Sequence, residues 1–168
     1  DDQRDTISYA EVLDKLGEAI IVKPVNLGSS VGVTKVNSEE DFAAALDEAF
    51  QYDHAILIEE FITGREVECA ILGNDEVIVS VAGEVKVSDK YDFYSFTAKY
   101  EDPEAAKVII PAEMDLAVHE DIKRLSLAAY RALQCADLSR VDLFVTAENM
   151  VYVNEVNTIP GFTNISMY

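Results

Sequence analysis

Apolar residues recur every three or four positions in three segments, the spacing that places one face of an α-helix against a core. Ser8-Tyr9-Ala10-Glu11 has the form of a capping box and begins a short helix that ends at Gly17. Ser38-Glu39-Glu40-Asp41 caps a second helix, and Asp115–Leu133 is long enough for a third. The residues expected to point inward are Phe42, Leu46, Ala49 and Phe50 in the second helix, and Val118, Ile122, Leu125 and Ala129 in the third.

Shorter apolar runs, bounded by Gly, Pro, Asn or Asp, predict β-strands around these helices. Ala19–Val25 is apolar on both faces and is expected to be central, and Ala55–Phe61 is also expected to be buried. Lys86–Asp102 is polar, aromatic and aperiodic, which predicts a long functional loop. The predicted strands are Ala19–Val25, Val31–Val36, Ala55–Phe61, Arg65–Leu72, Glu76–Val85, Lys107–Pro111, Arg140–Val145 and Val151–Asn157. We therefore expect an α+β protein with mostly antiparallel strands in two lobes.

Composition narrows the classes of partner. Of the 168 residues, 49% are hydrophobic and 27% charged, which suits a globular chain and excludes a disordered acidic tail. No apolar run approaches the ~20 residues that a membrane helix needs. The net charge is −19, and such an acidic field should repel nucleic acid and anionic lipid, so we expect neither as a partner. Cys69 and Cys135 lie far apart in apolar segments, so we expect reduced thiols and a cytoplasmic protein.

The last two predicted strands form a hairpin that carries Asp142 on one strand and Glu155 on the other. A two-residue turn at Glu148-Asn149 would pair these carboxylates, a four-residue turn would keep them on one face, and an odd-length loop would separate them. Carboxylate and amide oxygens suit a Mg²⁺ ion that holds substrate phosphates. The alternative is the solvated polar face of a half-exposed sheet. The polar positions of this face are Arg140, Asp142, Glu155 and Asn157.

Two features near the N-terminus are candidates for anion binding. Gly28-Ser29-Ser30-Val31-Gly32 places small residues between two strands, where backbone N–H groups can approach an anion. It matches neither common glycine-rich phosphate motif, so a plain hairpin turn is the alternative. Lys23 interrupts an apolar strand, so its ammonium must either reach solvent or meet an anion, such as a ligand phosphate.

Together these segments resemble the D-alanine–D-alanine ligases of the ATP-grasp superfamily, from about Ile7 to Tyr168. The resemblance implies an ATP-grasp fold, in which two α+β lobes with mostly antiparallel sheets grip ATP between them. Residues 1–62 would form the central lobe and residues 63–168 a truncated C-terminal lobe. The N-terminal substrate domain would be absent, so we expect part of a longer enzyme. The motifs that carry the resemblance are Ile21-Val22-Lys23-Pro24, Gly28–Gly32, Thr97-Ala98-Lys99-Tyr100, Arg140-Val141-Asp142 and Asn154–Thr163.

The resemblance also implies a set of ATP contacts. Lys23 would contact the phosphates, Glu66 the ribose hydroxyls, and the backbone of the linker Glu59–Ile62 the adenine. Lys99 and Tyr100 would lie on a mobile loop that closes over the phosphates. The implied ATP-binding residues are Lys23, Ser29, Ser30, Glu59, Glu60, Phe61, Ile62, Glu66, Lys99 and Asn154.

The remaining implied roles concern metal and D-alanine. Two Mg²⁺ ions, or Mn²⁺ in their place, would bind Asp142, Glu155 and Asn157. Ser166 and Met167 would border the second D-alanine. The implied catalytic residues are Ser29, Tyr100, Arg140 and Gly161, of which Arg140 and the Gly161 backbone would stabilise the oxyanion.

The implied reaction makes D-alanyl-D-alanine for peptidoglycan precursors. The carboxylate of one D-alanine attacks the γ-phosphoryl of ATP, and the amine of a second D-alanine then attacks the acyl phosphate. The parent enzyme is expected to be a cytoplasmic homodimer. Two alternatives remain: a D-alanine–D-lactate or D-alanine–D-serine ligase, against which Tyr100 argues for the dipeptide, or a nucleotide- and Mg²⁺-binding module without ligase activity.

Overall fold

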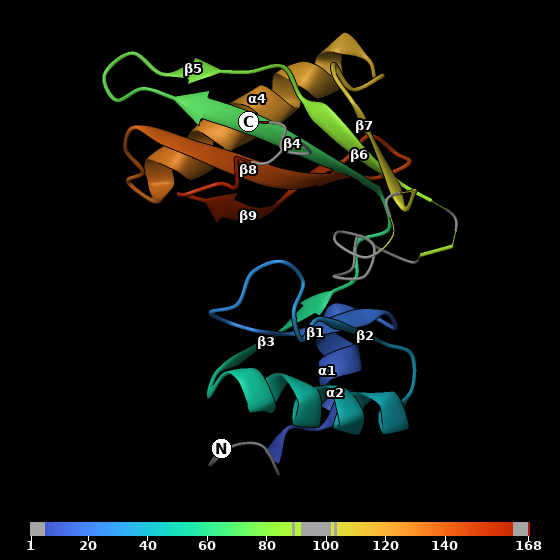
Figure 1. The fold of residues 1–168 in the computed structure, drawn as a ribbon. Coiled ribbons are helices and arrows are strands. Elements are labelled where there is room, and N and C mark those ends of the chain that lie inside the picture. The colour runs from blue at the N-terminus through green and yellow to red at the C-terminus, as the bar shows by residue number, and fades with distance from the viewer. Residues whose placement is uncertain (1–5, 89, 92–101, 103, 163–167) are drawn as a thin grey trace. The chain divides into compact units, whose positions relative to one another are not determined.

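The structure, a computed structural model, describes residues 6–88, 90–91, 102, 104–162 and 168. The chain divides into two compact units, the first with Asp1–Phe61 and Asp89–Ala105, the second with Ile62–Ser88 and Ala106–Tyr168. Each unit has its own sheet and its own hydrophobic core (Figure 1). All described strand pairs are antiparallel, which confirms the predicted α+β class.

In the first unit, strand β1 (Ile20–Pro24) lies between β2 (Thr34–Val36) and β3 (Ile56–Glu60). Helices α1 (Tyr9–Leu16) and α2 (Glu39–Tyr52) both pack against this sheet. Because successive strand residues point to opposite faces, the helix-facing positions form a continuous apolar layer. The buried residues of this core are Ile20, Val22, Val36, Phe42, Ala45, Leu46 and Ala49.

Both helix starts in the first unit are confirmed by their hydrogen bonds. The Ser8 hydroxyl accepts from the Glu11 N–H at 3.5 Å, and the Ser38 hydroxyl accepts from the Asp41 N–H at 3.1 Å. These contacts satisfy backbone donors that the first turn of a helix leaves unpaired. Helix α1 ends at Gly17, which has a φ of 86°, a conformation that glycine adopts without steric cost.

The expected burial of two strands was wrong in part. β1 is central, but only Ile20, Val22 and Pro24 are buried, while Ile21 and Lys23 on the other face are partly exposed. β3 is an edge strand without a fully buried residue. Both helices pack on the face that carries the core, so apolar residues of the other face stay partly exposed.

In the second unit the strand order is β7-β6-β4-β8-β9, and β5 pairs with β4. Helix α4 (Leu116–Ala132) lies across one face of this sheet (Figure 1). The other face carries the polar residues of the final hairpin. The strands are β4 (Arg65–Leu72), β5 (Ile78–Val79), β6 (Gly83–Val87), β7 (Ala106–Ile109), β8 (Leu138–Val145) and β9 (Val151–Asn157).

The core of the second unit follows a strict alternation along its two central strands. The side chains toward α4 come from Val67, Cys69 and Ile71 on β4 and from Val141, Leu143 and Val145 on β8. On α4, the buried positions recur every four residues, at Val118, Ile122, Ser126 and Tyr130. Leu125 and Ala129, which we expected to point inward, pack only partly against this core. Both cysteines are free, and burial raises the pKa of the Cys69 thiol.

The single strand predicted over Glu76–Val85 is instead two strands, β5 and β6. The break lies at Ser80, whose hydroxyl accepts from the Ala70 N–H at 2.9 Å and donates to the Val81 carbonyl at 2.7 Å. The side chain of Ser80 therefore replaces a backbone partner in the ladder with β4. A serine hydroxyl competes with the backbone in this way, which interrupts regular pairing.

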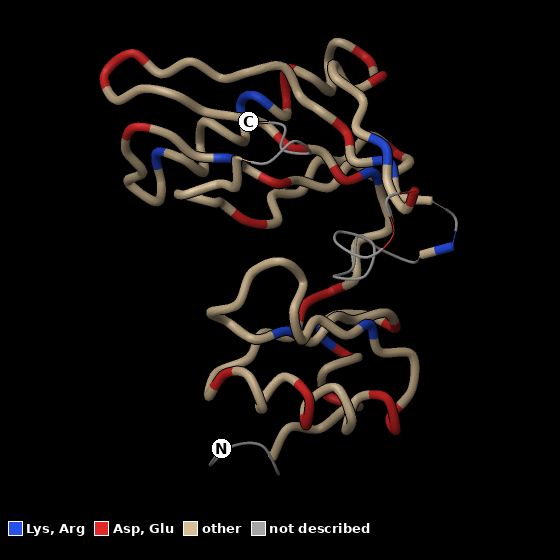
Figure 2. The backbone as a smooth tube through the Cα atoms, in the orientation of Figure 1, with Lys and Arg blue, Asp and Glu red and all other residues tan. Residues whose placement is uncertain are grey.

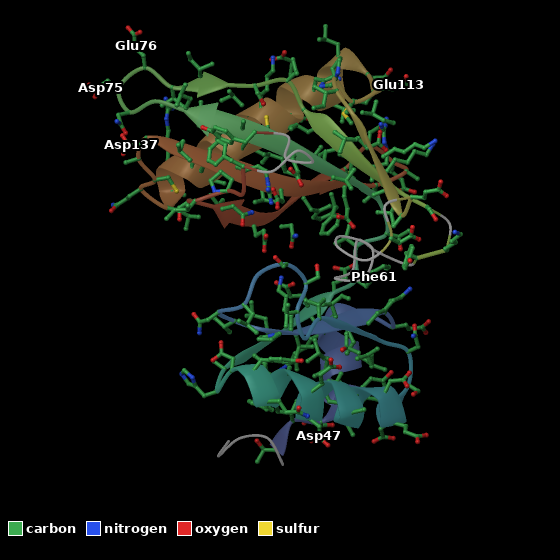
Figure 3. The ribbon with its side chains drawn as sticks, viewed as in Figure 1. Asp47, Phe61, Asp75, Glu76, Glu113 and Asp137 are labelled. Carbon is green, nitrogen blue, oxygen red and sulfur yellow. The ribbon has the colours of Figure 1, made fainter. Side chains whose placement is uncertain are left out.

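The turn after β4 is held by the loop before β8. The Asn74 amide donates to Asp137 Oδ1 at 2.9 Å, and the Asp137 N–H donates to Asn74 Oδ1 at 2.8 Å. Figure 3 shows Asp137 beside the turn that carries Asp75 and Glu76. Gly73 has a φ of 115°, and a Cβ there would lie 2.1 Å from the Glu76 carbonyl oxygen, so the turn requires glycine.

We predict that Ile122→Ala lowers the free energy of unfolding of the second unit by about 2–5 kcal/mol, because it opens a cavity beneath β4 and β8. Hydrogen exchange of the β8 amides measures this change without interference from the first unit. The matched control is Leu116→Ala on the same helix, since Leu116 is 76% exposed and should change stability little. Equal effects of the two substitutions would contradict the assignment of the core.

Candidate functional site

The polar face of the second unit depends on the register of the hairpin β8–β9. Asp142 pairs with Glu155, and Arg140 pairs with Asn157, as the alternation predicted. These residues therefore share one face of the sheet, while Val141 and Leu143 point toward α4 on the other.

The turn that produces this register differs from the predicted one. The Thr146 N–H donates to the Met150 carbonyl at 2.9 Å, so the loop between the strands has three residues, Ala147 to Asn149. Asn149 has a φ of 64°. An odd loop alone would separate the carboxylates. A β-bulge compensates: Asp142 pairs with Glu155 but Leu143 pairs with Val153, which leaves Asn154 without an opposite residue. The two irregularities cancel, and the four polar residues return to one face.

Arg140 is the centre of the hydrogen bonds on this face. Its Nε and Nη2 donate to the two carboxylate oxygens of Asp142, at 2.6 and 2.7 Å. Its Nε also lies 3.1 Å from Glu68 Oε2. The side chains of Arg140, Asp142 and Glu68 are 19%, 17% and 16% exposed. Burial by itself would lower the pKa of Arg140, but Asp142, followed by Glu68 and Glu155, raises that pKa overall, so the guanidinium stays charged.

Glu68 is the residue of this face that we did not predict. It lies on β4, where it pairs with Asp142 across the ladder. The signal was present in the sequence: Glu66 and Glu68 alternate with the apolar residues that face the core, so both must occupy the opposite face. What the sequence did not show was that β4 is the neighbour of β8.

Asp142, Glu155 and Asn157 form the donor set closest to a metal site. The Asn157 amide nitrogen donates to Asp142 Oδ2 at 3.0 Å and to Glu155 Oε1 at 3.2 Å. If the Asn157 amide rotated, its oxygen instead of its nitrogen would face Asp142 and Glu155, and the three side chains could then share a cation. Among the described residues, no group of three or more His, Cys, Asp or Glu side chains is placed to hold a metal ion. The fit therefore rests on two carboxylates and an amide, which are hard oxygen ligands.

The local charge favours a cation. Glu68, Asp142 and Glu155 carry three negative charges against the single positive charge of Arg140, a formal sum of −2. Acidic residues are also frequent elsewhere in both units (Figure 2). A nucleotide can approach such a surface only where a cation reverses the local field.

The other predicted residues of this unit are distributed as follows. Glu66 lies on β4, two positions before Glu68 and on the same face. Gly161 lies beyond β9, and an added Cβ there would meet no atom of the described residues within 4 Å. Asn154 is the bulge residue. The predicted residues Lys99, Tyr100, Ser166 and Met167 lie outside the described residues.

In the first unit, Lys23 forms an ion pair with the carboxylate of Glu59. Its ammonium lies 2.5 Å from Glu59 Oε2 on the neighbouring strand β3, and the side chain is 18% exposed. On the same face, the ammonium of Lys35 lies 4.2 Å from the centre of the Phe61 ring, a cation–π contact. The described part of this face therefore carries two cations, of which Lys35 was not predicted.

The predicted adenine linker Glu59–Ile62 is in part a strand. Glu59 and Glu60 are the last residues of β3, and the Phe61 N–H donates to the Ala19 carbonyl at 2.8 Å. Because bonded pairs alternate along an antiparallel ladder, Glu59 and Phe61 turn their backbone groups toward β1, and Glu60 turns them away. No described strand pairs with β3 on that side. The backbone of Glu60 is thus the part of the segment that a ligand can use.

The loop Gly28–Gly32 is a tight and strained turn. The Val31 N–H donates to the Gly28 carbonyl at 3.2 Å, and Ser29 and Ser30 between them both have a φ of 59°. Residues other than glycine in this conformation cost on the order of 1–3 kcal/mol each, and such strain is concentrated at ligand sites. A plain hairpin turn would place glycine or asparagine at these positions, so the strain favours a functional loop.

Asp53 anchors the start of this loop. Its Oδ2 accepts from the Asn26 N–H at 2.8 Å and from the Asn26 side-chain amide at 2.7 Å, and its Oδ1 accepts from the Ala55 N–H at 3.2 Å. Burial by itself would raise the pKa of Asp53, but these hydrogen bonds and the neighbouring His54 lower that pKa overall. The carboxylate therefore ties the end of α2 to the segment that leads into Gly28.

Comparison with known proteins identifies the family. The family model described as "D-ala D-ala ligase C-terminus" matches residues 1–168. The chain belongs to this family. A D-alanine–D-alanine ligase of Proteus mirabilis (strain HI4320) is 52% identical over 166 residues, which are 99% of this chain and 45% of that protein. The chain thus spans about half the length of the relatives it matches.

Solved structures of the D-Ala–D-Ala ligase family confirm the ATP-grasp fold. The D-alanine–D-alanine ligase from Coxiella burnetii is 39% identical with a TM-score of 0.75, over 95% of this chain and 41% of that one. The VanG D-Ala:D-Ser ligase from Enterococcus faecalis is 40% identical with a TM-score of 0.82, over 95% of this chain and 46% of that one. Both likenesses cover both units of the present chain.

We predict that Asp53→Ala lowers the melting temperature of the first unit at pH 7. Because the folded pKa of Asp53 is below its ordinary value of 3.8, its contribution is present at neutral pH and is lost as the pH falls through the lowered pKa. The difference from wild type should therefore shrink below pH 3.8. Glu48→Ala, which removes the contact from Glu48 to Thr34 between α2 and β2, controls for general loosening of α2. A difference that persists undiminished in acid would contradict the role of the Asp53 carboxylate.

Proposed function

We propose that this chain is the ATP- and metal-binding part of an enzyme that joins two D-alanines to D-alanyl-D-alanine for peptidoglycan synthesis. The observation that carries the proposal is the face of Arg140, Asp142, Glu155 and Asn157, assembled by the bulged hairpin in a chain that belongs to the D-Ala–D-Ala ligase family. The geometry supports phosphoryl transfer followed by attack on an acyl carbon, because it combines oxygen ligands for Mg²⁺ with a fixed guanidinium.

The roles on the second unit follow from the hydrogen bonds. Asp142, Glu155 and Asn157 would hold the divalent cation, which when bound would neutralise charge on the ATP phosphates. Nη1 of Arg140 donates to no described residue, so it can donate to an oxyanion while Asp142 and Glu68 fix the rest of the guanidinium. The backbone N–H of Gly161 would be the second oxyanion donor, and Glu66 on β4 would accept from the ribose hydroxyls.

The roles on the first unit concern the nucleotide. Lys23 would exchange Glu59 for a phosphate oxygen, and the N–H groups around Ser29 and Ser30 would approach the phosphates. The free backbone of Glu60, continued by Ile62, would bind adenine beside Phe61. Asn154, Lys99 and Tyr100 complete the proposed ATP and D-alanine contacts, with Ser166 and Met167 at the second D-alanine.

The finer features of the parent enzyme are proposals as well. These include two Mg²⁺ ions with Mn²⁺ as a substitute, a lobe boundary after residue 62, a homodimer and a cytoplasmic location. In the described chain, no helix combines the length and apolar character that crossing a membrane requires. A second candidate activity is D-alanine–D-serine ligation, which the likeness to the VanG D-Ala:D-Ser ligase favours.

We predict that the chain binds a non-hydrolysable ATP analogue in a Mg²⁺-dependent manner and that Glu155→Ala abolishes this dependence. Glu155 supplies one of two carboxylates in the donor set, and the loss of a charged ligand weakens metal binding strongly. Isothermal titration with and without Mg²⁺ measures the effect. Glu148→Ala, in the exposed loop of the same hairpin, removes the same charge and should leave Mg²⁺ dependence unchanged. Unchanged Mg²⁺ dependence in Glu155→Ala would remove the metal assignment.

We also predict that these 168 residues alone hydrolyse ATP slowly but form no dipeptide, because they match only 45% of the length of the relatives. Two small zwitterions offer few atoms for binding, so their positioning needs a complete site. Chromatography after incubation with ATP, Mg²⁺ and D-alanine, D-serine or D-lactate tests this, with the full-length parent as control. D-alanyl-D-serine as the main product of the parent would replace the dipeptide assignment, and dipeptide from the chain alone would show that both amino-acid sites lie within it.

A further inference from the structure

Arg140 shares its Nε between two carboxylates. Asp142 accepts from both Nε and Nη2 at 2.6 and 2.7 Å, whereas Glu68 lies 3.1 Å from Nε alone. Asp142 is the stronger partner, because a bidentate contact fixes a guanidinium more tightly than a single one. Without Glu68, the position of Arg140 would therefore depend on Asp142.

Asp142 also takes part in a second set of interactions. Its Oδ2 accepts from the Asn157 amide, and it is one of the two carboxylates of the proposed metal set. A carboxylate that turns its oxygens to a divalent cation can no longer accept two N–H bonds from the same guanidinium. Arg140 would then lose its main partner at the stage when its orientation matters most.

Glu68 is placed to prevent that loss. It lies across the ladder from Asp142, on the central strand β4, and its side chain is only 16% exposed. On this face, the structure shows Glu68 in contact with Arg140, 3.1 Å from its Nε. The contact to Arg140 Nε leaves Nη1 free to donate elsewhere.

We propose that Glu68 is the positioning residue of Arg140 and holds its guanidinium when Asp142 turns to the metal ion. The metal-bound half of this proposal rests on the proposed function. Its physical basis is a competition between a guanidinium and a cation for one carboxylate, which a second carboxylate resolves. With Glu68 in place, Asp142 can coordinate the metal ion while the guanidinium of Arg140 stays oriented toward the substrate.

The first test needs neither nucleotide nor metal. The side-chain Nε–H signals of the five arginines are recorded by NMR in chain labelled with ¹⁵N-arginine, and Arg140→Lys assigns the Arg140 signal. In Asp142→Ala the signal should persist, because Glu68 Oε2 lies 3.1 Å from Nε and can then accept from it. In Glu68→Ala/Asp142→Ala, which has neither acceptor, the signal should be lost to exchange with water. Loss of the signal in Asp142→Ala alone, or its persistence in the double variant, would overturn the proposal.

The second test adds a non-hydrolysable ATP analogue and Mg²⁺. Wild type should keep the Arg140 signal. Glu68→Ala should lose it on saturation and need about tenfold more Mg²⁺ for half-saturation, the effect of losing one charge-assisted contact. Glu84→Ala is the matched control: it removes the bidentate pair of Glu84 with Arg65 in the same sheet, on the face toward α4. It should leave the Arg140 signal and the Mg²⁺ requirement unchanged.

The outcomes separate the two proposals. If wild type shows no Mg²⁺-dependent binding of the analogue, the proposed function fails, while the ligand-free test still decides whether Glu68 holds Arg140. If Glu68→Ala keeps the Arg140 signal in the saturated state, the positioning role is wrong even though the nucleotide binds. Should Asp142→Ala not fold, as judged from the β8 amide signals, Asp142→Val replaces it with the same expected results, because valine suits a strand and also lacks an acceptor.

Discussion

The register of the hairpin β8–β9 is the constraint on which the proposed chemistry depends. Side chains alternate between the faces of a strand, so a shift by one residue would send Glu155 and Asn157 to the face toward α4. The three-residue loop introduces such a shift, and the bulge at Asn154 reverses it. The bulge brings a carboxylate and an amide back beside Asp142 and Arg140, so the proposed metal site depends on it.

The two faces of this sheet separate stability from chemistry. The face toward α4 is a dry layer from Val67 to Val145, and it fixes the backbone on which the other face depends. On the opposite face, charges are partly buried and paired, with Arg140 among three carboxylates. The positive charge of Arg140 offsets part of the repulsion among these carboxylates.

The first unit uses conformational strain and pairing in a similar way. Asp53 holds Asn26, and the loop that follows places Ser29 and Ser30 in a conformation that serine rarely adopts. Lys23 on β1 forms an ion pair with Glu59 on β3, which holds the ammonium in place within an apolar strand. In the proposed function, both arrangements would hold groups ready for an anion, which would lower the cost of ordering them on binding.

The sequence by itself determined the helices, most strands and the family resemblance, because local periodicity and capping residues carry that information. The pairing of Asp142 with Glu155 was expected from a two-residue turn, but it arises from a three-residue loop and a bulge that local periodicity does not reveal. It did not reveal that Ser80 divides a strand, since a side chain that replaces a backbone partner acts only within a formed ladder. It also missed Glu68, because the neighbour of β8 is β4, more than sixty residues earlier, and only sheet topology brings them together. Local structure follows from local sequence, whereas the partner of a charge is decided by which strands become neighbours.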